Sequence, residues 1–205
     1  MRVKGERFFE VYNGHPSVRD LGDATHASTE RMWDIINTRR LTDLKLGLLY
    51  GLATDDAHNY HGVAATRSNT GRGWVMVRAA KLNAAALVTS MEKGDFYSST
   101  GVTLKSLKQT SKEIDLTIQA EAGVQYTTQF IGTRRGYDAT HKPITLANGT
   151  KLRVTHRYSA DVGQVLDALL ALGLGSLRVR LLRVRELRVH LGLRDPPLVP
   201  KRRVA

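Results

Sequence analysis

Residues 46–58 read LGLLYGLATDDAH, so nine mostly apolar residues run directly into two aspartates and a histidine. A short apolar run without helical periodicity, rich in aliphatic and aromatic residues, is typical of a buried strand. The polar group at its end predicts that this strand stops where a loop begins. The stretch therefore predicts a buried strand that delivers Asp55, Asp56 and His58 to the edge of a sheet.

Strands and helices are predicted to alternate on both sides of this run. Capping residues and glycines mark the helix ends, since Ser28 and Asn83 suit an N-cap and Gly94 suits a C-cap. The order strand, helix, strand, strand, helix predicts an α/β fold with a largely parallel sheet or barrel over residues 1–101. The other segments are a strand at 7–13, a helix at 28–37, a strand at 73–79 and a helix from Asn83 to about Lys93.

The pattern changes after Gly101. Apolar and polar residues alternate in VTLKSLKQ, EIDLTIQAEA, YTTQFIGT and KLRVTHRYS, between residues 102 and 159. Such alternation is typical of strands with one buried face, and Asn148-Gly149 is a strong hairpin-turn signal. Residues 102–164 are therefore expected to form a small antiparallel β domain.

The last stretch, residues 165–205, differs from the rest of the chain in composition. Eleven leucines lie between Leu166 and Leu193, and residues 171–205 carry +7 of the chain's total charge of +12. One interpretation is an arginine-rich amphipathic helix with a loose end. Another is a disordered or frame-shifted tail that does not belong to the fold. The body of the chain is left with an ordinary charge, which argues against a nucleic-acid partner.

Composition excludes several classes of function. The chain has no cysteine, which excludes disulfides, cysteine-ligated zinc and thiol catalysis. The early part of the chain has no run of 18 apolar residues, so no membrane span is expected. The first 14 residues lack the apolar core of a secretory signal, so the cytoplasm is the default expectation. The oligomeric state stays open.

The strongest candidate for chemistry is Asp56-Ala57-His58. In a strand, residues i and i+2 point to the same face, so this carboxylate and this imidazole would converge on one point. An oxygen and a nitrogen donor together suit zinc, manganese or iron. The alternative interpretation is an aspartate that caps a turn beside a solvated histidine.

Two further segments carry candidate residues. Glu10 lies in an otherwise apolar strand, and Asn13-Gly14 precedes His15-Pro16; His15 either borders a site or is exposed at a turn. Arg72, between two glycines, could hold a phosphate or carboxylate through a bidentate contact. It could equally be a solvated arginine at the start of a strand.

In order along the chain, FEVYNGHP, WDIIN, YGLATDDAHNYH, GRGWVMVRA and EKGDFYSSTGV resemble the C-terminal half of a PHP (polymerase and histidinol phosphatase) domain. The likeness is to its carbaryl-hydrolase-like metallohydrolase branch, which has an added β domain, and it runs from about Phe8 to Ser159. The resemblance implies a partial, distorted (β/α) barrel with divalent metal ions, Zn, Mn or Fe, at the ends of its strands. It also implies hydrolysis of a small-molecule substrate such as a phosphoester.

The resemblance also implies roles for individual residues. Asp56 and His58 match a late metal-binding Asp-x-His pair of the family. Glu10 and Asn13 match a motif that borders the site, and His15 matches a histidine common in this branch. These three residues are the candidates for the catalytic surroundings.

The family's opening His-x-His motif is missing, because no His-x-His occurs in the chain. The sequence is therefore expected to be a fragment with weak metal binding and negligible turnover of its own. Two other functions remain open: a nucleic-acid or anionic-surface binder acting through Arg178–Arg203, and a β-rich binding module over about 102–158.

Overall fold

The computed structural model describes residues 3–64, 66–110, 113–172, 176–182 and 188–190. The chain divides into two compact units. The first consists of Met1–Thr100 and Gly136–Gly163, and the second of Gly101–Arg135 and Gln164–Ala205. The candidate residues before Gly101 therefore all lie in the first unit.

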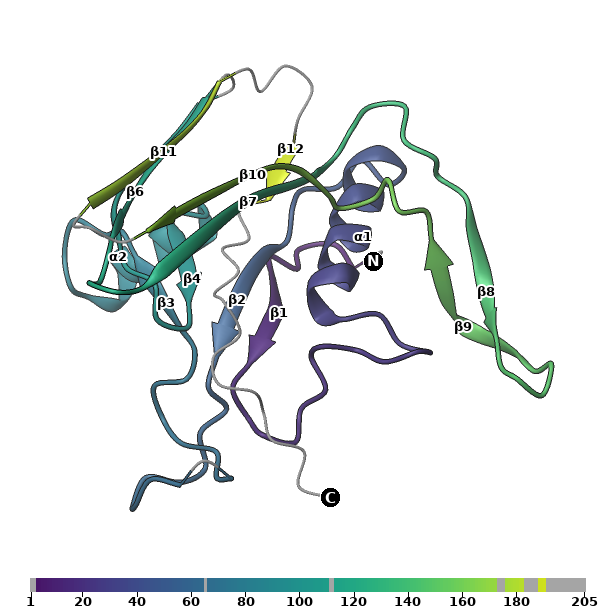
Figure 1. Ribbon diagram of the computed structural model, residues 1–205, viewed down its shortest axis with the longest axis horizontal. Helices are drawn as coiled ribbons and strands as arrows, with labels where there is room; N and C mark the ends of the chain where they lie inside the picture. Colours follow the sequence, from purple (N-terminus) through teal and green to yellow (C-terminus); the bar gives the residue numbers. More distant parts are fainter. Residues whose placement is uncertain (1–2, 65, 111–112, 173–175, 183–187, 191–205) are drawn as a thin grey trace. The chain divides into compact units, whose positions relative to one another are not determined.

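The first unit begins with a strand–helix–strand motif (Figure 1). β1 (Phe8–Asn13) and β2 (Tyr50–Thr54) pair in parallel, and α1 (Thr29–Thr42) connects them. α1 starts where the sequence predicted, because the Ser28 side chain accepts a hydrogen bond from the Arg31 N–H at 3.1 Å. This motif brings the ends of β1 and β2 to the same edge of the pair.

A polar clamp fixes α1 to the segment that leads into β2. The Asn37 side chain is fully buried and forms hydrogen bonds with both backbone groups of Leu49. Trp33 donates a second hydrogen bond to the Leu49 carbonyl, at 2.8 Å. A buried asparagine is thus satisfied by backbone, as buried polar groups generally are.

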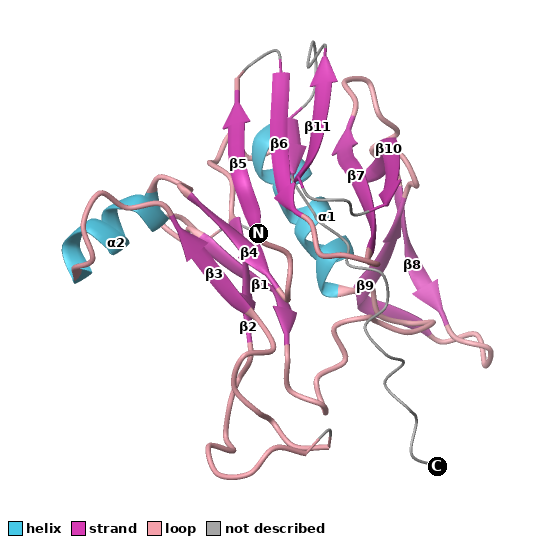
Figure 2. Ribbon diagram, turned by 60° about the vertical axis from the view of Figure 1, so that its left-hand side comes forward, coloured by secondary structure: helices cyan, strands magenta, loops and turns pink. Residues whose placement is uncertain are grey.

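β3 (Trp74–Val77) and β4 (Phe96–Ser99) form a separate antiparallel pair, and α2 (Ala84–Glu92) lies between them in sequence. The Asn83 side chain caps α2 as predicted, and Gly94 follows it with φ +74°. No residue of α2 is buried. Figure 2 shows the helix beyond the ends of β3 and β4 rather than across their faces.

The predicted (β/α) barrel is wrong, because no such barrel exists among the described residues. The strands form small separate sheets, and only the β1–β2 pair is parallel. A barrel needs each helix to cross over between parallel strands and bury one face. α2 instead joins antiparallel strands and has no fully buried residue. The gap between β2 and β4 is bridged by a side chain: the Ser98 hydroxyl donates to the Gly51 carbonyl and accepts from the Ala53 N–H.

Replacing Gly94 with alanine should destabilise the first unit by about 1–3 kcal/mol. Gly94 has φ +74°, and a Cβ there would clash with the Tyr50 ring. Both the backbone conformation and the ring would have to change. Urea unfolding followed by circular dichroism measures the loss. Gly71→Ala is the matched control, because Gly71 has φ +77° with open space around it; equal losses would show that the Tyr50 contact contributes nothing.

The first unit also contains a hairpin formed by β8 (His141–Thr145) and β9 (Lys151–Tyr158). Its turn includes Asn148 and Gly149, and Gly149 has φ +82°. The hairpin signal in the sequence is therefore confirmed at this position. Figure 1 shows the two strands in green, side by side.

The second unit consists of two three-stranded antiparallel sheets, in the orders β11-β6-β5 and β10-β7-β12. Alternate side chains of β6 and β7 build its core, as the sequence alternation predicted: Ile114, Leu116, Ile118, Tyr126 and Phe130. The strands are β5 (Leu104–Gln109), β6 (Glu113–Gln119), β7 (Gln125–Thr133), β10 (Gln164–Leu172), β11 (Ser176–Leu182) and β12 (Arg188–His190).

The helical interpretation of the leucine-rich stretch is wrong where the structure describes it. Residues 164–172 and 176–182 are strands paired with β7 and β6. Most of the basic tail assigned to anion binding, residues 183–187 and 191–205, lies outside the described residues. Across the described ranges, no helix has the length and apolar character needed to cross a membrane.

Candidate functional site

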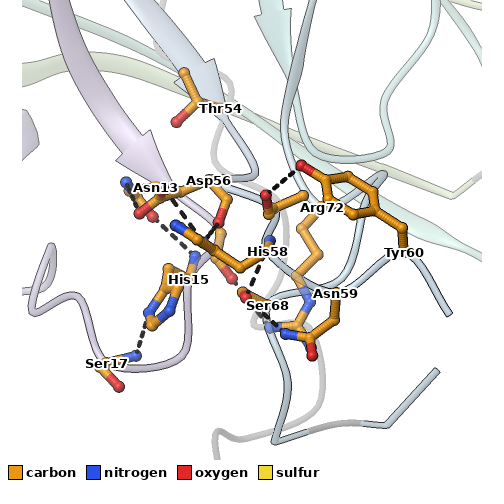
Figure 3. Close-up of polar contacts among 12 residues, drawn as sticks. Asn13, His15, Ser17, Thr54, Asp56, His58, Asn59, Tyr60, Ser68 and Arg72 are labelled. Atoms are coloured by element: carbon orange, nitrogen blue, oxygen red, sulfur yellow. Dashed lines mark hydrogen bonds and ion pairs between the residues drawn. The ribbon is translucent and has the colours of Figure 1, made fainter. Parts of the chain in front are cut away.

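The candidate residues from two distant segments meet where β1 and β2 end (Figure 3). The Gly14 N–H donates to the Thr54 carbonyl at 2.8 Å, so the pairing of the strands continues one residue past β1. Gly14 is buried, and a Cβ there would lie 2.6 Å from the Arg72 side chain. Glycine at this position lets the chain that follows β1 approach the loop that follows β2.

Asn13 connects the two segments. Its amide nitrogen donates one hydrogen bond to Glu10 Oε2 at 3.2 Å and another to Asp56 Oδ2 at 3.3 Å. Its carbonyl oxygen accepts from the His15 backbone N–H at 2.8 Å. The amide has two N–H bonds and uses one for each carboxylate. The 7% exposed Asn13 therefore holds two acidic side chains on the same nitrogen.

Asp56 and His58 converge, but not for the reason that the sequence suggested. β2 ends at Thr54, and Asp56 has φ +48°, a left-handed conformation that aspartate tolerates better than most residues. The alternation of a strand thus does not apply. The imidazole folds back instead, so that His58 Nδ1 lies 2.7 Å from the Asp56 carbonyl oxygen and 3.8 Å from its carboxylate.

The hydrogen bonds of the two histidines assign opposite tautomers. A carbonyl oxygen can only accept, so His58 carries its proton on Nδ1 and its Nε2 keeps a lone pair. The backbone N–H of Ser17 can only donate, so His15 Nδ1 accepts at 3.1 Å and a neutral His15 carries its proton on Nε2. The two rings meet edge to face, with centroids 5.6 Å apart.

Asp55 and Arg72 organise the loop around these residues. Asp55 accepts a hydrogen bond from the Gly71 N–H at 2.7 Å. The Arg72 guanidinium donates to the Gly14 carbonyl at 3.0 Å. Arg72 is therefore placed at the site, half-buried, and ties the loop after β2 to the end of β1.

Three residues of the site were not predicted. Thr54 donates to Glu10 Oε1 at 2.6 Å, Ser68 accepts from the His58 backbone N–H, and Ser17 orients the His15 ring. Thr54 directly precedes Asp55 and Asp56 in the sequence, so its position could have identified it as a site residue. Nothing in the loop sequence distinguishes Ser68.

The site is open to solvent: the side chains of His58 and Asp56 are 65% and 42% exposed. Within the described ranges, no three or more histidine, aspartate and glutamate side chains are grouped so that they could hold a metal ion. Oxygen and nitrogen donors are nevertheless present in adjacent positions, which is the ligand chemistry of manganese and zinc.

Comparisons with protein families, with curated proteins and with solved structures found no match to this chain.

Proposed function

We propose that the chain binds a divalent cation, Zn²⁺, Mn²⁺ or Fe²⁺, at Asp56 and His58 and has the site of a metal-assisted phosphoester hydrolase. One observation supports this above all: Asn13 hydrogen-bonds both Glu10 and Asp56, which are separated by 46 positions of chain and lie at one strand edge. The resemblance of residues 8–159 to PHP metallohydrolases suggests the reaction class.

The tautomers of the two histidines suit different tasks. His58 Nε2 has a free lone pair, and the hydrogen bond from Nδ1 to the Asp56 carbonyl holds the ring as backbone carbonyls commonly hold metal-binding histidines. His15 Nε2–H is a donor instead, suited to a leaving-group oxygen. We therefore assign His58 as the ligand and His15 as a hydrogen-bond donor to the leaving-group oxygen.

The surrounding residues would position the substrate. The Arg72 guanidinium contributes a fixed positive charge that suits a phosphate. Glu10 and Asn13 hold the Asp56 carboxylate in place through the shared amide. When bound, the cation would lower the pKa of a coordinated water and neutralise charge on the attacked group.

The oxygen and nitrogen atoms at the site are of the type that binds such a cation. Their small number limits the affinity. Within the described residues Asp56 and His58 are the ligand pair, and the rest of the coordination would be water. The absence of a larger metal-binding group among the described residues predicts weak binding and slow turnover.

The test is Mn²⁺ binding, followed by the electron paramagnetic resonance signal of the free ion. Asp56→Ala and His58→Ala should each weaken binding at least about tenfold and bring phosphoester hydrolysis to background, because each removes a ligand. His61→Ala is the matched control, since His61 is an exposed histidine close in sequence and outside the site. Unchanged Mn²⁺ binding by Asp56→Ala would refute the site.

A further inference from the structure

A second pair of histidines lies on the β8–β9 hairpin, outside the site described above. His141 on β8 and His156 on β9 have their Nδ1 atoms 2.7 Å apart and their ring centroids 4.8 Å apart. In the strand register His141 lies opposite Tyr158, and Pro143 lies opposite His156. The two histidines are therefore diagonal neighbours on one face of the hairpin.

The short separation of the two nitrogens has a chemical consequence. Each Nδ1 has one position, which holds either a proton or a lone pair. At 2.7 Å only one proton fits between them, so at least one lone pair is directed at the other ring. The same position suits a metal ion, which accepts a lone pair from both nitrogens at about 2.0–2.1 Å. The exposed His141 side chain can rotate to give the small extra separation that this needs.

Neighbouring groups fix the orientation of the pair. The Tyr158 ring lies 4.8 Å from the His141 ring, centroid to centroid, with 31° between the planes. Its hydroxyl accepts a hydrogen bond from Arg39 at 3.1 Å, and Arg39 is itself paired with Asp43 at 2.8 Å. Tyr158 is thus held in place by α1 and limits the movement of His141.

There is also room for water beside the pair. A cavity of about 40 Å³ is lined by His141, Tyr158, Tyr137, Arg39 and Asp43, among others. This is more than the roughly 10–15 Å³ that one water needs. Water molecules in it could complete the coordination of an ion that has only two protein ligands.

We propose that His141 and His156 form a two-histidine chelate for a transition-metal ion, with water in the remaining positions. Two imidazoles favour Cu²⁺ over Ni²⁺ and Zn²⁺ under the usual order of stability. Hard ions such as Mn²⁺ prefer oxygen ligands and should bind weakly to this histidine pair. The site needs no residue of the proposed hydrolase site.

The charges around the pair keep the expected affinity moderate. Lys142 and Arg157 face each other across the hairpin in adjacent register positions, and Arg39 is balanced by Asp43. A positive surrounding opposes a cation, and salt screens this repulsion. Binding should therefore weaken little, or strengthen, as the salt concentration rises.

The test uses the untagged full chain and Cu²⁺, followed by electron paramagnetic resonance and equilibrium titration. The spectrum should show hyperfine coupling to two imidazole nitrogens. His141→Ala and His156→Ala should each weaken Cu²⁺ binding at least about tenfold. His156→Gln keeps a polar side chain on β9 and should lose binding as well, which separates a lost ligand from a disturbed hairpin.

Controls separate this site from the proposed hydrolase site. His26→Ala removes an exposed histidine that pairs only locally with Asp23 and Thr25, and it should leave Cu²⁺ binding unchanged. The titration is repeated in His58→Ala, where the copper site of the hairpin should persist even if the hydrolase proposal fails. Equal Cu²⁺ affinity in the parent, His141→Ala and His156→Ala would overturn the proposal and leave a pair that shares a proton only.

Discussion

Replacing Asn37 with leucine is expected to lower the free energy of unfolding by about 2–4 kcal/mol. The Asn37 side chain is 0% exposed, and its amide oxygen accepts from the Leu49 N–H at 2.8 Å while its nitrogen donates to the Leu49 carbonyl at 3.0 Å. Leucine has a similar volume but no polar atoms. The Leu49 N–H would remain buried without this partner, and a lost partner of a buried group costs more than the bond contributed.

Equilibrium unfolding in urea measures this loss. Tryptophan fluorescence suits it because both tryptophans, Trp33 and Trp74, lie in the first unit. Thr89→Val is the matched control: it removes a hydroxyl that donates to a carbonyl of the same helix, at an exposed position. Water can replace that bond, so its cost should stay below about 0.5 kcal/mol. Similar losses in the two variants would mean that the clamp on Leu49 does not stabilise the fold.

The sequence predicted local features well because local chemistry determines them. The caps of both helices, Ser28 and Asn83, satisfy backbone N–H groups three residues away. Gly94 and Gly149 adopt positive φ angles, as a helix end and a tight turn require. Each of these depends on a few neighbouring residues, so a short stretch of sequence is enough to identify it.

The barrel could not be judged from short stretches of sequence, because a barrel depends on which strands pair with each other. The sequence around β3 and β4 fits a parallel or an antiparallel arrangement, and the alternation of elements favoured the first. In the structure the two strands are antiparallel, and the Ser98 hydroxyl connects β4 to β2. Only the burial of α2 would have distinguished them, and helix exposure cannot be predicted reliably from nine residues of which several are alanine.

The strands of the leucine-rich stretch were missed for a related reason. Leu177, Val179 and Leu181 alternate with arginines, which is a period of two and typical of a strand. The leucine clusters that precede residue 177 do not alternate with polar residues, and they favour the prediction of a helix. Pairing with β6 over seven residues settles the local conformation in favour of strand.

Four residues of the candidate site were expected from the sequence, but its three hydroxyl residues and the connections between the residues were not. Glu10, Asn13, Asp56 and His58 do lie together, and sequence could name them because acidic and imidazole side chains at strand ends are unusual. The bond from Asn13 to Asp56 spans 43 positions. Asp56 has a positive φ, and no local sequence pattern predicts it.

Replacing Asn13 with aspartate should make the stability of the chain depend on metal. The two N–H groups that hold Glu10 Oε2 and Asp56 Oδ2 would be replaced by a third carboxylate at about the same distances, 3.2 and 3.3 Å. Without metal, the loss of these bonds and the repulsion should destabilise the chain by about 2–3 kcal/mol. With a cation bound at Asp56 and His58, the carboxylate at position 13 becomes a further ligand, so metal binding should reverse this loss.

Thermal unfolding with and without Mn²⁺ measures this reversal. At a free Mn²⁺ concentration of about 100 times its Kd, binding to the folded state contributes about 2.7 kcal/mol, enough to offset the expected loss. Asn13→Ala is the matched control, because it removes the same hydrogen bonds and adds no carboxylate; it keeps Asp56 and His58, so Mn²⁺ should stabilise it less than Asn13→Asp. Mn²⁺ is preferred here because it takes oxygen ligands and avoids the histidine pair on the β8–β9 hairpin. An equal response of the two variants to Mn²⁺ would show that the side chain at position 13 does not reach a cation held by Asp56, which contradicts the proposed site.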